Sequence, residues 1–228
     1  VAREPAERFA SLGYLHEVLL KCLAAQAYGR VRALELASPE LVAFLRDEFR
    51  QPSAGHWAQL LAQSQKVLIQ ARDRPARFLD GLLRKKLRDA PVLELDRMIT
   101  KLLGHTQQDK TKVSLAELLQ SLIELRNKTR GHGAPRRAFF EDINPLMEAS
   151  LQVAIQILQP HLWSNLVYLE EIIPQEDNVS LEGQVLAGIT RRPWQATFAP
   201  VAWLQPQRLF LLESAEDSQA LYPLDPLL

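Results

Sequence analysis

Hydrophobic residues recur at steps of three and four over most of the first 160 positions, which is the spacing of one face of an α-helix. The longest such segment covers residues 5–32. The same pattern predicts helices from Pro39 through Phe49, from Ser53 through Leu68, over 75–88, from Pro91 through Leu103, from Ser114 to near Thr129, and over about 138–160. These segments together predict a bundle of helices.

Polar residues at the ends of these segments support the helix assignment. Ser38, Pro39 and Glu40 are a typical helix start, with a capping hydroxyl, a proline in the first turn and an acid beside the positive end of the helix dipole. Ser114 and Glu117 have the spacing of a capping box. Pro160 is predicted to end the last helix.

After about residue 165 the pattern changes to short apolar and β-branched runs. Strand-like segments cover 166–173, 179–189, 194–203 and 209–212, and residues 221–226 are extended at best. Gly183 and Gly188 are possible β-bulges. We therefore expect an α+β protein: a mainly α-helical domain over 1–163, then a small antiparallel β module of four or five strands over 164–228. A module of this size should pack on the helices or on a neighbour.

Composition limits the classes of protein that fit. Hydrophobic residues make up 47% of the 228, which is enough for a core. Cys22 is the only cysteine, which excludes an internal disulfide and fits a reducing cytoplasm. No apolar run approaches the roughly 20 residues that a membrane span needs. The chain starts without Met and without a signal peptide, so we expect a piece of a longer protein.

The formal net charge of zero hides an asymmetry. Residues 66–137 carry 17 Lys and Arg against 8 Asp and Glu, while the remainder carries 10 against 19. A basic block of this kind favours a polyanionic partner such as RNA. On charge alone the solvated face of a helix is the more common explanation, as for Arg84, Lys85 and Lys86.

The segment from Arg126 to His132 carries the clearest chemical signal. A guanidinium can hold a phosphate, and an imidazole can transfer protons near neutral pH. Arg126 and Asn127 close a predicted helix, and His132 follows between Gly131 and Gly133. We find no histidine pair with metal-ligand spacing, no phosphate-binding glycine loop and no serine-hydrolase elbow, so we expect neither a metal nor a cofactor.

This segment resembles the signature of the HEPN family of small helical bundles: an Arg, often followed by Asn, and a His four to six residues later. Arg126, Asn127 and His132 match these three positions, before a final long helix as in the family. The architectural resemblance covers roughly residues 5–163, and the specific identity covers seven residues.

The resemblance implies a metal-independent endoribonuclease of the cytoplasm, within a larger regulatory, antiviral-defence or toxin-like protein. Arg126 would stabilise the phosphate, His132 would act as general acid or base, and Asn127 would orient either the phosphate or the His. RNA backbone would also meet Lys128, Arg130, Arg136 and Arg137. A single His cannot easily be both acid and base, so a homodimer is expected, with a fused or partner sensor domain as a further possibility.

Other interpretations remain open at this point. Arg126 could simply cap helix carbonyls, with His132 as a loop residue, in a bundle that serves only as an interaction or scaffold domain. A nucleotide-sensing domain is a third option. In the β module, the four aromatic residues are either a small core or a platform that stacks bases: Trp194, Phe198, Trp203 and Phe210.

Overall fold

The computed structural model describes residues 4–36, 38–105, 110–131, 136–162, 165–187, 190–215 and 218–224. The helices are α1 (Pro5–Ala33), α2 (Pro39–Asp47), α3 (Ala54–Gln70), α4 (Arg74–Leu83), α5 (Ala90–Leu102), α6 (Leu115–Gly131) and α7 (Arg137–Leu162). The strands are β1 (Lys86–Leu87), β2 (Val113–Ser114), β3 (Asn165–Pro174), β4 (Val179–Ala187), β5 (Thr190–Phe198), β6 (Arg208–Ala215) and β7 (Ser218–Pro223). The predicted α+β class, with helices first and an antiparallel sheet after them, is confirmed.

The helices begin where the capping residues predicted. Ser38 accepts a hydrogen bond from the Leu41 backbone N–H, and Ser53 accepts one from that of His56. At the start of α6, the Glu117 N–H donates to Ser114 Oγ at 3.2 Å, and the Ser114 backbone N–H donates back to the Glu117 carboxylate at 2.5 Å. The capping box predicted from sequence is therefore present, and it satisfies backbone donors that a helix start leaves unpaired.

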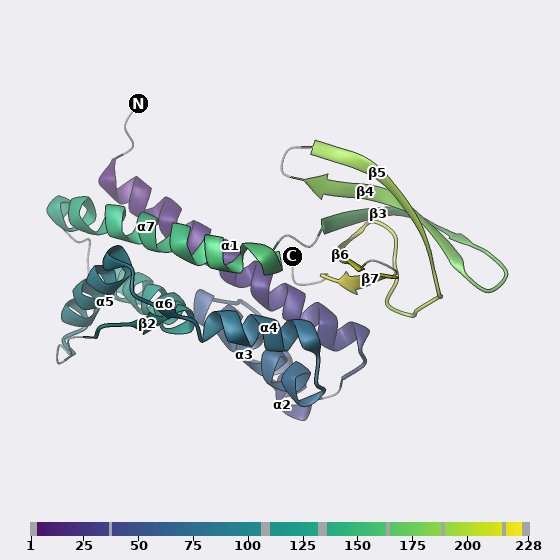
Figure 1. Cartoon of the computed structure of the whole chain (residues 1–228), viewed down its shortest axis with the longest axis horizontal. Coiled ribbons are helices and arrows are strands. Elements are labelled where there is room, and N and C mark those ends of the chain that lie inside the picture. Colours follow the sequence, from purple (N-terminus) through teal and green to yellow (C-terminus); the bar gives the residue numbers. More distant parts are fainter. Residues whose placement is uncertain are drawn as a thin grey trace.

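Helix α1 runs through the molecule and contacts most of its other parts (Figure 1). It packs against α3, α6 and α7, and its other flank contacts β7. The main core lies between these helices and is built chiefly of leucines, among them Leu20, Leu23, Leu60, Leu95 and Leu122. Burying this many large aliphatic side chains supplies the main driving force for the bundle.

The last five strands form one antiparallel sheet in the order β5-β4-β3-β6-β7, which curls at one side of the helices (Figure 1). Side chains on one face make a core of their own around Val167, Leu181 and Phe210. Trp194, Phe198 and Trp203 pack against that core. Of the four aromatic residues, Phe210 is therefore buried in this core and the other three are partly buried against it, which favours the core interpretation over the base-stacking platform.

A bulge in β3 between Leu169 and Glu171 lies opposite Gly183 of β4. A Cβ at Gly183 would come within 2.4 Å of the Tyr168 carbonyl oxygen, so only glycine fits there. The predicted bulge is thus real but belongs to the facing strand. Gly188 lies outside the described residues.

The sheet is joined to the helices along the second half of α1. At Gly29 a Cβ would come within 2.4 Å of the Pro223 carbonyl oxygen, which shows how closely α1 approaches β7. The next residue, Arg30, bonds Asp73 through Nη2 at 2.7 Å and Nε at 3.2 Å, and its guanidinium lies 4.4 Å from the centre of the Tyr222 ring. The β module therefore packs on the helices, as expected, through the contact between α1 and β7.

Several predicted boundaries were wrong. The helix predicted over 75–88 ends at Leu83, because Lys86 and Leu87 pair instead with Ser114 and Val113, a long-range contact that local periodicity cannot reveal. Phe78, a hydrophobic residue of that predicted helix, is about half exposed.

Two further boundaries differ from the prediction, and each involves a proline. Helix α7 continues past Pro160 to Leu162, since a proline in the last turn removes little of the helix hydrogen bonding. Strand β5 begins at Thr190 rather than Trp194 and includes Pro193, which an edge strand tolerates. Residues 218–223 form a regular strand paired with β6. Among the described residues, no helix is long and apolar enough to cross a membrane.

Candidate functional site

Arg126 lies near the end of α6 and is tied to α1. Its Nη2 donates to the Glu17 carboxylate at 2.7 Å, and the two side chains are 17% and 15% exposed. Glu17 also accepts Lys21 Nζ at 3.1 Å. The cluster of two cations and one acid therefore keeps a net charge of one positive unit, which suits an anionic ligand.

The guanidinium has donors that this ion pair does not use. Arginine carries five N–H groups in a planar fork, and no other hydrogen bond to Arg126 occurs within the described ranges. One turn further on, the Thr129 hydroxyl donates to the carbonyls of Leu125 and Arg126 at 2.9 and 3.1 Å. The end of α6 is thus held in place while part of the guanidinium stays available.

A buried histidine lies beside this ion pair. His16 of α1 is 1% exposed, and neither ring nitrogen has a hydrogen-bond partner of normal geometry in the part of the chain described. Burial lowers the pKa of His16 to about 4; the neighbouring Leu119 backbone opposes this, and Arg126 adds to it. His16 is therefore neutral at physiological pH.

The start of α7 is also anchored to α1. The Phe9 ring lies 6.3 and 5.2 Å, centre to centre, from the rings of Phe139 and Phe140. The Asn144 side-chain amide donates to the Pro5 carbonyl at 2.8 Å, and Arg8 pairs with Glu148. Both helices that flank residues 132–135 are consequently fixed on the same neighbour.

Arg126 faces a small cavity between these helices. The cavity has a volume of about 260 Å³ and is lined mainly by apolar groups, with Arg126 and Thr129 as its polar members. Phe9 and Phe140 form part of the wall. A cation at the edge of an apolar cavity interacts strongly with a bound anion, because little water competes there.

The other predicted site residues are placed less completely. Asn127 is exposed and Lys128 is half-buried on α6. Arg136 is exposed just before α7. Arg137 is exposed and pairs with Glu141 at 2.8 Å and Glu4 at 3.9 Å, which offsets its charge toward RNA. His132 lies outside the described residues, as does the side chain of Arg130.

The sequence alone does not predict Glu17 or His16 as neighbours of the motif. A signal for His16 was present, because it follows Leu12 by four positions and precedes Leu19 by three, on the apolar stripe of the helix. Nothing in the local sequence pairs Glu17 with a residue 109 positions away. Within the described ranges, no group of three or more His, Cys, Asp or Glu side chains is arranged to hold a metal.

Larger cavities lie elsewhere among the described residues. An apolar groove of about 720 Å³ runs between α3, α4 and α6, and a more polar pocket of about 520 Å³ lies on the sheet. Comparison of the chain with protein-family models, curated proteins and solved structures finds no match. The relation to HEPN proteins therefore rests on the motif and stays a prediction.

Proposed function

We propose that this chain is a metal-independent endoribonuclease of the HEPN type, acting in the cytoplasm as part of a larger regulatory or defence protein. The observation that carries the proposal is the placement of Arg126. It lines a cavity at the end of α6, is oriented by Glu17, and keeps guanidinium donors for a phosphate. His132 follows α6 by one residue.

In the proposed reaction the 2′-hydroxyl of one ribose attacks the adjacent phosphorus. A base removes the hydroxyl proton, the bond to the 5′ oxygen breaks, and an acid protonates that leaving oxygen. The products are a 2′,3′-cyclic phosphate and a 5′-hydroxyl. Arg126 stabilises the charge that builds on the phosphate oxygens, and His132 serves as one of the two proton-transfer groups.

Since one imidazole cannot act as base and acid in the same step, the proposal includes a homodimer that supplies His132 from both copies. Asn127, exposed beside Arg126, would orient the phosphate or the His. Lys128, Arg130, Arg136 and Arg137 would contact RNA backbone, and Arg137 would do so weakly while Glu141 and Glu4 hold it.

The test is cleavage of RNA by purified protein in the presence of a chelator. We expect His132→Ala and Arg126→Ala to abolish cutting, with products of the wild-type reaction ending in a cyclic phosphate. His105→Ala is the matched control, because His105 is an exposed histidine just beyond α5. Equal cleavage by wild type and His132→Ala, with folding unchanged, would remove the enzyme proposal.

A second candidate is a non-catalytic interaction domain. The partly buried Arg126–Glu17 pair favours it, because an ion pair that joins α1 to α6 is sufficient reason for an arginine at that position. This candidate predicts a protein that self-associates without cutting RNA. Sedimentation of wild type and His132→Ala would then give the same assembly state.

A further inference from the structure

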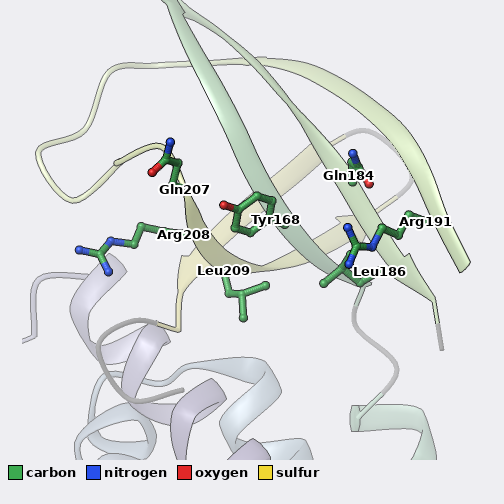
Figure 2. A pocket seen from close by; sticks show the side chains of 7 residues that line it. All are labelled: Tyr168, Gln184, Leu186, Arg191, Gln207, Arg208 and Leu209. Carbon is green, nitrogen blue, oxygen red and sulfur yellow. The ribbon is translucent and has the colours of Figure 1, made fainter. Parts of the chain in front are cut away.

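A second cationic pocket lies on the sheet. Its volume is about 520 Å³, and its walls come from four neighbouring strands or the residues beside them (Figure 2). In the sheet register Tyr168 lies between Gln184 on one side and Leu209 on the other, and Leu186 faces Arg191. Figure 2 shows the Tyr168 ring in the middle of the group, with Arg208 and Arg191 on opposite sides. The volume lies within the range of about 300–1,000 Å³ common for small-molecule sites.

The positive charge of the module is concentrated here. Residues 165–224 contain three basic and eight acidic side chains, and two of the three basic ones, Arg191 and Arg208, line this pocket. No acid lines it. Glu170 is close, since it accepts a hydrogen bond from the Gln184 amide at 2.7 Å. The pocket is therefore a local cationic site within an acidic module, and the surrounding acids disfavour a long polyanion.

The backbone at the pocket is under strain. Gln207 has a φ of 60°, in the left-handed region that residues other than glycine seldom occupy. Its N–H donates to the Leu169 carbonyl at 2.7 Å, at the bulge of β3. This bond fixes Gln207, and with it Arg208, at the rim of the pocket. Strained backbone of this kind is concentrated at ligand-binding positions.

We propose that this pocket binds a mononucleotide. Arg191 would hold the phosphate, because a guanidinium matches phosphate oxygens in charge and geometry. The Tyr168 ring, flanked by Leu186 and Leu209, offers a flat apolar surface for a base. The side-chain amide of Gln207 carries both donors and an acceptor, which suits the polar edge of a base. The pocket is separate from Arg126, so this proposal does not depend on the proposed ribonuclease activity.

Isothermal titration calorimetry with AMP, GMP, CMP and UMP tests the proposal, with adenosine and inorganic phosphate as the two halves of the ligand. We expect at least one nucleotide to bind with a 1:1 ratio, about tenfold or more tighter than either half. Arg191→Gln should weaken that binding by about tenfold or more, and Tyr168→Leu by a similar factor.

Arg192→Gln is the matched control. Arg192 is the next residue of β5, is also exposed, and points to the opposite face of the sheet from Arg191. Its loss should leave affinity within about twofold of wild type, a shift too small for a lost phosphate contact. The proposal is overturned if no nucleotide binds at millimolar concentration, if phosphate alone binds as tightly, or if both arginine variants weaken binding equally. Circular dichroism confirms folding, and Arg191→Gln decides alone if Tyr168→Leu does not fold.

Discussion

Two of the arginine–carboxylate pairs of helix α1, Arg30–Asp73 and Glu17–Arg126, differ in how completely the arginine is used. Towards the sheet, Arg30 meets Asp73 through two nitrogens, stacks on Tyr222 and is sealed, with side chains 8% and 7% exposed. Nearer the start of the helix, Glu17 meets Arg126 through one nitrogen, beside a cavity, and both side chains keep about twice that exposure.

The difference separates an arginine that holds the fold together from one that can also meet a ligand. Asp73 caps α4 by accepting the Ala76 N–H at 2.9 Å, so the Arg30 pair joins a helix start, a helix and a strand. A buried pair of this kind leaves a costly unpaired charge when one partner is removed. The Arg126 pair is more exposed to solvent, so removing one of its partners should cost much less free energy.

The largest expected effect is at Arg30. Arg30→Met keeps much of the packing on Tyr222 but leaves Asp73 buried without its partner, so we expect the free energy of unfolding to fall by about 3–5 kcal/mol. Arg126→Met, measured beside it by urea denaturation, should cost about 1 kcal/mol. Equal losses in the two variants would contradict the distinction between the pairs.

Acid should act on the Arg126 end through His16. Its pKa is about 4 in the folded chain and 6.5 for the free side chain, so the unfolded state takes up the proton first as pH falls. The contribution of neutral His16 to the free energy of unfolding is therefore fully present above about pH 6.5. It falls by about 3 kcal/mol as the pH approaches 4. Urea midpoints of wild type and His16→Leu across this range should diverge accordingly.

The charges facing His16, on Glu17 and Arg126, are the same in both proteins, so the difference isolates the imidazole. His105→Leu, at an exposed position, provides the reference for an unburied histidine. Parallel pH profiles for wild type and His16→Leu would show that His16 is not kept neutral in the folded state.

A smaller effect tests the joint between α1 and the sheet. Gly29→Ala places a methyl group against the Pro223 carbonyl and should cost about 1–3 kcal/mol through overpacking. Gly13→Ala in the same helix meets nothing within 4 Å and should add up to about 1 kcal/mol through better helix propensity. Thermal unfolding of both variants measures the contrast, and opposite signs are the expected result.

Helix starts and strands could be predicted from the sequence, whereas long-range ion pairs could not. Ser38, Ser53 and the Ser114–Glu117 box marked helix starts because capping is a contact between residues a few positions apart. The alternation after residue 165 predicted the strands for the same reason. The Arg30–Asp73 and Arg126–Glu17 pairs depend on the tertiary fold, which no local pattern encodes. The same holds for the β1–β2 pairing and for the clustering of Arg191 with Arg208.

The smallest expected effect concerns the salt dependence of RNA binding, and it rests on the proposed ribonuclease function. Glu17→Gln removes the acid that shares the Arg126 charge, so a phosphate at that guanidinium should release more counterion. The slope of log affinity against log salt should steepen by up to about 0.7, the value for one added contact on single-stranded nucleic acid. Glu141→Gln, which removes one partner of exposed Arg137, is the comparison for a surface arginine. Adding Arg126→Met to Glu17→Gln should cancel the change, because the effect is assigned to that guanidinium alone. A steeper slope that survives the double substitution would place the RNA contact elsewhere on the basic surface.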